Sequence, residues 1–187
     1  PGETVSAIAP IQRLAGGKGG NQALAAATAG ARVVMIGAVG DDEPGRAYTV
    51  RLSGRGVFPR LAIAFGVPTG TAYVWVDETG ENAIVVAPGA NAHARAEVAD
   101  LTPEDVLLCQ LEVPVDVVAQ AVRTAARLGA RVVLNAAPYA ALPDDVLAIA
   151  DPLVVNEHEA GLLADSGAVP RSLLVTCADR TLPPMVK

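Results

Sequence analysis

The stretch VLLCQLEVPVDVVAQAVRTAARLGARVVL, residues 106–134, determines the fold class of this protein. It begins with an apolar run at 106–110 and ends with a second one at 132–134. The segment between them, 114–128, predicts a helix that ends at Gly129, a residue type that often follows the last helical turn. Continuously apolar strands joined by a helix are typical of a parallel sheet that helices cover on both faces.

The same alternation of strand and helix extends along the rest of the chain. We expect further strands at 33–36, 153–155 and 173–176, and helices from 22, from 42 to about 53, at 144–150 and at 157–164. The segments 4–13 and 61–86 have a different pattern, and 71–86 predicts a hairpin turning at Asp77–Gly80. The sequence therefore predicts an α/β fold: a mainly parallel central sheet flanked by helices, of the three-layer Rossmann type. A small antiparallel flap from 4–13 and 61–86 completes a single domain over 1–187.

Composition excludes several classes of protein. The chain has 187 residues, 51% of them apolar, which is too many for a disordered protein. Its net charge of −6 argues against nucleic acid or an anionic membrane as the main partner, and we recognise neither a signal peptide nor an apolar run of membrane-spanning length. Cys109 and Cys177 stand in apolar runs, so we interpret them as core residues of a cytoplasmic, reducing environment rather than as a disulfide or metal ligands.

The run GGKGGNQ, residues 16–22 and hereafter the glycine segment, is the strongest candidate for a binding site. Its four glycines let the backbone approach a ligand closely, and the helix expected from Gln22 would point free N–H groups at that ligand. Lys18 adds a cation, and Asn21 adds a donor and an acceptor. This set suits a polyhydroxylated or anionic ligand. The alternative is a flexible turn with a solvated lysine, although a turn needs only one or two glycines.

Two common phosphate-binding motifs do not match the glycine segment. A Walker A loop requires glycine four residues before Gly-Lys and Ser or Thr after it, whereas Gln12 precedes and Gly19 follows here. The dinucleotide fingerprint Gly-x-Gly-x-x-Gly is not present in a strand–turn–helix setting either.

Several segments of the chain resemble those of a known protein family. The run GGKGGNQALAAATAGARVVMIGAVGDDEPG, 16–45, resembles the N-terminal signature of the ribokinase-like (PfkB) carbohydrate kinase family. Five later segments resemble family segments in the same order: PTGTAYVWVDETGENAIVVAPGAN, LLCQLEVP, LNAAPYAALPDD, LVVNEHEA and LLVTCADR. The lysine of the glycine segment favours the ribokinase branch over the fructokinase and adenosine kinase branches.

The resemblance implies an ATP-dependent sugar kinase that phosphorylates a primary hydroxyl of ribose or a similar sugar. The sugar hydroxyls would be held by Gly17, Lys18, Gly19, Gly20, Asn21 and Glu112. Taken from the residues alone, Glu112 is equally well a carboxylate exposed at a strand end. Asp41 and Asp42 match a family turn, and we interpret both as helix-capping residues.

The resemblance also implies ATP and Mg²⁺ as cofactors, with a monovalent cation as a further candidate. Nucleotide contacts would come from Asn156, Thr176, Ala178, Asp179, Arg180 and Thr181. Glu159 and Glu157 would help to place Mg²⁺ through water. Asn156 and Glu157 equally fit a helix N-cap followed by a first-turn acid, which requires no ligand, and both functions are compatible. His93 and His158 are expected at the surface, and Trp75 in core or dimer packing.

The family's catalytic Gly-Ala-Gly-Asp motif is expected after Lys187, and the family's first strand before Pro1. We therefore expect an incomplete chain with negligible turnover by itself, and a homodimer formed through the flap. The alternatives are a non-catalytic sugar-binding or dimerising module, and another sugar or nucleoside kinase of the same family.

Overall fold

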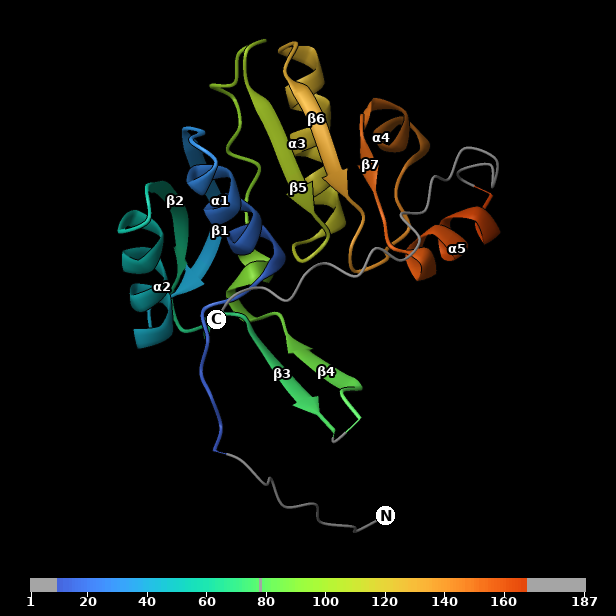
Figure 1. Cartoon of the computed structure of the whole chain (residues 1–187). Coiled ribbons are helices and arrows are strands. Elements are labelled where there is room, and N and C mark those ends of the chain that lie inside the picture. Colours follow the sequence, from blue (N-terminus) through green and yellow to red (C-terminus); the bar gives the residue numbers. More distant parts are fainter. Residues whose placement is uncertain (1–9, 78, 168–187) are drawn as a thin grey trace.

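The computed structural model describes residues 10–77 and 79–167 (Figure 1). The helices are α1 (Lys18–Thr28), α2 (Glu43–Ser53), the 3-10 helix η1 (Gly89–His93), α3 (Val115–Arg127), α4 (Asp144–Ile149) and α5 (Glu157–Asp165). The strands are β1 (Val33–Gly40), β2 (Val57–Ala64), β3 (Thr71–Val76), β4 (Asn82–Ala87), β5 (Val106–Gln110), β6 (Arg131–Asn135) and β7 (Leu153–Val154). The strand expected at 173–176 lies outside the described residues.

The strands form three groups. β1 pairs in parallel with β2, and β5, β6 and β7 pair in parallel in that order. β3 and β4 form the antiparallel hairpin that the sequence predicted, with Tyr73 opposite Val85 and Trp75 opposite Ala83. Parallel sheets with helical crossovers and one small antiparallel sheet confirm the predicted α/β fold.

Two parts of the flap prediction are wrong, while its residues 4–9 lie outside the described residues. Residues 61–64 belong to β2 and pair in parallel with β1 rather than with the hairpin, and residues 10–13 form no strand. Gly37 stands opposite Leu61 in this register. Alternating β-rich residues fit an edge strand of a parallel sheet as well as a hairpin, and among the described strands β2 pairs with β1 alone.

Helices cover the two faces of β5. Successive side chains of a strand point to opposite faces, and those of Leu107 and Cys109 pack against the core beneath α3, whereas Gln110 contacts Gln22 of α1. α1 and α3 therefore lie on opposite faces of β5, as the three-layer prediction requires. The amino-terminal half of the α1 face is less covered, because Val106 and Leu108 are 51% and 40% exposed.

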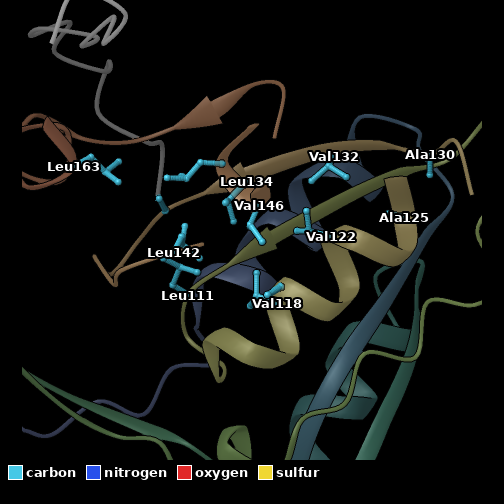
Figure 2. Close-up of a cluster of buried hydrophobic side chains, with 13 residues drawn as sticks. Leu111, Val118, Val122, Ala125, Ala130, Val132, Leu134, Leu142, Val146 and Leu163 are labelled. Atoms are coloured by element: carbon cyan, nitrogen blue, oxygen red, sulfur yellow. The ribbon is translucent and has the colours of Figure 1, made fainter. Parts of the chain in front are cut away.

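The main core lies between α3, α4 and the sheet β5–β6–β7. Figure 2 shows Val118 and Val122 of α3 pointing toward Val132 and Leu134 of β6, with Val146 of α4 beside them. The exposure of Val122, Leu134 and Val146 is 0%. Burial of this kind contributes about 1.5–3 kcal/mol for each large aliphatic side chain. We therefore expect this core to hold the carboxyl ends of β5, β6 and β7 in place.

Cys109 is a core residue, as predicted. Burial raises the pKa of its thiol to about 12, so the thiol stays protonated and a poor nucleophile at neutral pH. Cys177 lies outside the described residues.

Helix α2 begins as the sequence predicted. Asp42 is its N-cap, and its carboxylate accepts hydrogen bonds from the Gly45 amide at 2.9 Å, the Thr69 amide at 2.8 Å and the Thr69 hydroxyl at 2.5 Å. These bonds, that of the Thr69 hydroxyl first, lower the pKa of Asp42. Asp41 instead forms an exposed ion pair with Arg46. Asp42 thus joins the start of α2 to the loop that precedes β3.

Candidate functional site

The predicted sugar-site residues lie at the carboxyl ends of the strands. Glu112 follows β5 by two residues, and in Figure 1 the arrowhead of β5 points toward the edge at which α1 begins. Ligands of open parallel α/β sheets bind at this edge, because loops and helix starts converge there. Asn156 also lies at this edge, two residues after β7.

The glycine segment begins a helix earlier than predicted. Helix α1 starts at Lys18 rather than at Gln22, with Gly17 as its N-cap at φ 85°. The first intrahelical bond runs from the Asn21 amide to the Gly17 carbonyl. The amides of Lys18, Gly19 and Gly20 therefore have no partner within the helix, and an anion or a hydroxyl oxygen is stabilised at such a helix start.

Glu112 meets this helix start directly. Its Oε2 accepts a hydrogen bond from the Lys18 amide at 2.7 Å, and its Oε1 lies 3.7 Å from Lys18 Nζ. The side chain of Glu112 is 32% exposed and that of Lys18 is 41% exposed, so solvent reaches this ion pair. Residues 94 positions apart are thus brought together. One oxygen of Glu112 and the ammonium group both remain open to a ligand.

The glycines of the segment have different functions. A side chain on Gly19 would place its Cβ 2.9 Å from Gln110 Oε1 and 3.0 Å from the Met35 methyl group, and one on Gly20 would overlap the Tyr48 hydroxyl. A Cβ on Gly16 would meet nothing within 4 Å. Gly19 and Gly20 therefore lack side chains because protein packs there, while their amides stay at the helix start.

Tyr48 and Gln110 also support this site, although neither was predicted to belong to it. The Tyr48 hydroxyl donates to the Gly16 carbonyl at 3.2 Å, and the Gln110 amide group donates to the side-chain oxygen of Gln22. Burial, followed by the charge of Glu112, raises the pKa of Tyr48. The only available signal was for Gln110, a polar residue ending an apolar strand. Nothing in the sequence near Tyr48 connects it with residue 16.

Asn156 and Glu159 form the start of α5. The Asn156 side chain accepts from the Glu159 amide at 2.8 Å, and Glu159 Oε2 accepts from the Asn156 amide at 2.9 Å, which is a complete capping box. Among the described residues Glu159 is the one buried charged side chain, whereas Glu157 is exposed. The capping interpretation of Asn156 is confirmed, and its nucleotide contact remains a prediction.

Several predicted positions cannot be placed. Thr176, Ala178, Asp179, Arg180 and Thr181 lie outside the described residues. Within the described part of the chain, no three His, Cys, Asp or Glu residues cluster as a metal site would require. Both histidines are exposed, as expected.

Two cavities lie away from the glycine segment. One of about 290 Å³ is lined by Tyr139 of the loop after β6, Asp144 of α4 and Leu163 of α5, among others. The other, of about 320 Å³, lies along the end of β2 near His93 and Arg95. Neither cavity is lined by Glu112 or by residues of the glycine segment.

Comparison with known proteins identifies the family. The family model of pfkB family carbohydrate kinases matches residues 1–175. The chain belongs to this family. It is 38% identical over 169 residues to a ribokinase of Haemophilus influenzae and 37% identical over 168 residues to one of Bacillus subtilis, in each case over 87% of this chain. It covers only 55% and 57% of those two proteins, so the chain spans about half the length of the curated relatives it matches.

A solved structure supports the same assignment to the pfkB family. The structure of Arabidopsis thaliana ribokinase complexed with ribose and ATP matches with a TM-score of 0.72 and 29% identity, over 88% of this chain and 56% of that one. In residues 10–77 and 79–167 no helix is long and apolar enough to cross a membrane.

Proposed function

We propose that this pfkB-family chain supplies the sugar-binding part of an ATP-dependent sugar kinase acting on ribose or a similar sugar. The observation that carries the proposal is the contact between the start of α1 and Glu112, 2.7 Å from the Lys18 amide. A helix start, a cation and a carboxylate on one accessible surface provide both donors and acceptors, which a polyol requires. The ribokinase relatives, and the ribose and ATP named for the Arabidopsis structure, support ribose as the acceptor.

Each site residue has a definite part in this proposal. Lys18 and Asn21 donate to sugar oxygens, the amides of Gly19 and Gly20 add backbone donors, and the open oxygen of Glu112 accepts from a hydroxyl. These contacts orient the acceptor, which is most of what a protein contributes to phosphoryl transfer besides neutralising charge. In the transfer the hydroxyl oxygen bonds to the γ-phosphorus, the bond to the ADP oxygen breaks, and the hydroxyl proton passes to a base. We place that base beyond the residues of this chain.

ATP, with its Mg²⁺, is proposed to lie toward the start of α5. Asn156 is exposed at the carboxyl edge, and the exposed carboxylate of Glu157 is suited to hydrated Mg²⁺. Glu159 fits less directly, because one of its oxygens accepts from the Asn156 amide. Bound Mg²⁺ would neutralise charge on the transferring phosphate. The same proposal includes a monovalent cation as a possible further cofactor. It also includes a cytoplasmic location and no nucleic acid or membrane partner.

Calorimetry on the chain tests the sugar site. We expect ribose to bind, and we expect Lys18→Met and Glu112→Gln to abolish the heat of binding. Arg46→Met is the matched control, because Arg46 is exposed and forms an ion pair with Asp41 just before α2. Absence of ribose binding, or equal binding by the Lys18 and control variants, contradicts the proposal. Fructose and adenosine in the same titration test the other acceptors of the family.

A coupled assay for ADP tests the catalytic half of the proposal. We expect no sugar-dependent ADP release from this chain, because the acceptor hydroxyl lacks a base. Ribose binding without transfer fits a part of a kinase and equally the non-catalytic sugar-binding module. Release of ADP at ordinary kinase rates shows that a base is present in the chain.

We further propose that the hairpin β3–β4 mediates a homodimer. All twelve of its residues are exposed, including Val74 and Trp75 at 55% and 57%. Tyr73 and Trp75 stack with ring centroids 6.3 Å apart on one face, and contiguous exposed apolar surface of this kind marks an interaction site. Sedimentation velocity should show a dimer that Trp75→Ser dissociates, whereas Phe58→Ser, at a 63% exposed side chain of β2, leaves it intact. A monomeric wild-type chain contradicts this proposal.

A further inference from the structure

Tyr48 occupies a space that the glycine segment leaves for it. Its hydroxyl lies where a side chain on Gly20 would begin, and its Cζ would lie 2.9 Å from that Cβ. The hydroxyl donates to the Gly16 carbonyl at 3.2 Å. The ring thus reaches from the middle of α2 across the buried face of Gly20 to the residue preceding the N-cap of α1.

The position of Tyr48 ties together parts of the site that are distant in sequence. Its ring packs in the small core between α1, α2 and the sheet β1–β2, together with Ala23, Leu52 and Val57. At its other end the hydroxyl holds the chain one residue before Gly17, whose φ of 85° directs the chain into the helix. The orientation of the Lys18 amide toward Glu112 depends on the hydroxyl contact and on the conformation of Gly17, because that amide belongs to the residue after Gly17.

The environment keeps Tyr48 a hydrogen-bond donor. Burial and the neighbouring carboxylate of Glu112 raise the pKa of its phenol, so the hydroxyl remains protonated well into alkaline solution. The charge of Arg51 acts on this pKa in the opposite direction and more weakly.

We propose that Tyr48 is the positioning residue of the sugar site, and that Gly20 lacks a side chain in order to admit the tyrosine ring rather than a ligand. Tyr48 does not contact the sugar in this proposal. It holds the Gly16 carbonyl and thereby the start of α1. The effect on sugar affinity rests on the proposed function, whereas the effect on the helix start does not.

The first experiment measures hydrogen exchange at the Lys18 amide in the full chain without sugar. We expect Tyr48→Phe, which retains the ring and removes the hydroxyl, to accelerate this exchange about tenfold, because the amide separates more often from Glu112. Tyr139→Phe is the matched control, since Tyr139 is also half-buried but lines the distant cavity beside α5. Unchanged exchange in Tyr48→Phe overturns the proposal, whether or not ribose binds.

The second experiment is a double-mutant cycle between Gly20→Ala and Tyr48→Leu. A methyl group on Gly20 must displace the flexible tyrosine ring, so Gly20→Ala should reproduce the faster Lys18 exchange. In the Tyr48→Leu background the same alanine should add less than a twofold further change. Additive effects of the two substitutions overturn the assignment of Gly20 to Tyr48, because contacting residues are expected to be coupled.

Ribose calorimetry completes the test. We expect Tyr48→Phe to weaken ribose binding at least fivefold. We expect its shift in the midpoint of thermal unfolding to be no larger than the shift that Tyr139→Phe causes. Equal losses of affinity and stability indicate a merely structural tyrosine and overturn the positioning function. If wild-type protein binds no ribose, the proposed function fails, and the exchange measurements still decide the part played by Tyr48.

Discussion

Replacement of Glu112 tests whether a carboxylate that follows β5 holds the start of α1. Glu112→Ala removes the 2.7 Å hydrogen bond from the Lys18 amide and the 3.7 Å approach of the Lys18 ammonium. A hydrogen bond to a charged group contributes about 1.5–3 kcal/mol, and a partly exposed ion pair adds no more than about 1 kcal/mol. We therefore expect Glu112→Ala to lower the free energy of unfolding by about 2–3 kcal/mol.

Glu112→Gln separates the two contributions. Glutamine still offers an oxygen to the Lys18 amide but carries no charge, so its expected loss is about 1 kcal/mol. Glu104→Ala is the control, because Glu104 is an exposed glutamate near the start of β5, and its effect should stay within about 0.5 kcal/mol.

Urea unfolding followed by far-ultraviolet circular dichroism measures all four proteins, with the slope of the transition compared to confirm that the unfolded states are alike. The expected order of loss is Glu112→Ala, then Glu112→Gln, then Glu104→Ala. Wild-type stability in both Glu112 variants would refute the reasoning, because the carboxylate would then contribute nothing to the helix start. Equal losses in alanine and glutamine would assign the whole effect to charge.

Three further predictions concern the scaffold. Leu134→Ala, at a side chain with 0% exposure in β6, should cost about 2–5 kcal/mol in urea unfolding, and a loss below about 1 kcal/mol would show that the core relaxes around it. Asp42, whose pKa is lowered from 3.8 mainly by the Thr69 hydroxyl, stabilises the fold fully above that unfolded-state value and loses this contribution as pH falls through the lower folded-state value. Asp42→Asn should therefore flatten the acid side of the stability–pH profile, and an unchanged profile would contradict this. Gly129→Ala should cost about 1–2 kcal/mol in thermal unfolding because φ is +78° after α3, and a stabilised variant would contradict the strain argument.

The region from β5 to α5 was predictable because its pattern of apolar residues agrees with the way its helices and strands pack. For α3, the apolar residues predicted a helix over 114–128, and the structure has Val115–Arg127 followed by Gly129 at positive φ. The hairpin β3–β4 was predicted for the same reason, since its alternating strands flank a turn.

Predictions from the sequence were wrong where tertiary contacts override local preference. Glycine is among the poorest helix formers, so 14–21 was expected to be a loop, yet α1 includes Lys18 to Asn21, and Glu112 accepts from its first amide. The end of β2 was assigned to the flap because alternation does not distinguish a parallel partner from an antiparallel one. Pro59, opposite Met35, was the available signal for an edge strand.

The candidate site was predictable only as a set of residues, and its supporting contacts were not. The resemblance connected the glycine segment with Glu112, and the structure brings them together. The packing of Tyr48 against Gly20 depends on the angle between α1 and α2, which no spacing in the sequence expresses.

The position of α1 between the two parallel sheets has a consequence for how the molecule responds to a ligand. This helix packs on β1 and β2, while its first residues contact Glu112 and its Gln22 contacts Gln110 from the other sheet. A small molecule seated at the beginning of α1 touches both halves at once, so its binding free energy also favours their mutual alignment. Saturation with such a ligand should therefore raise the cooperativity of unfolding of the whole molecule, beyond protecting the few residues it contacts.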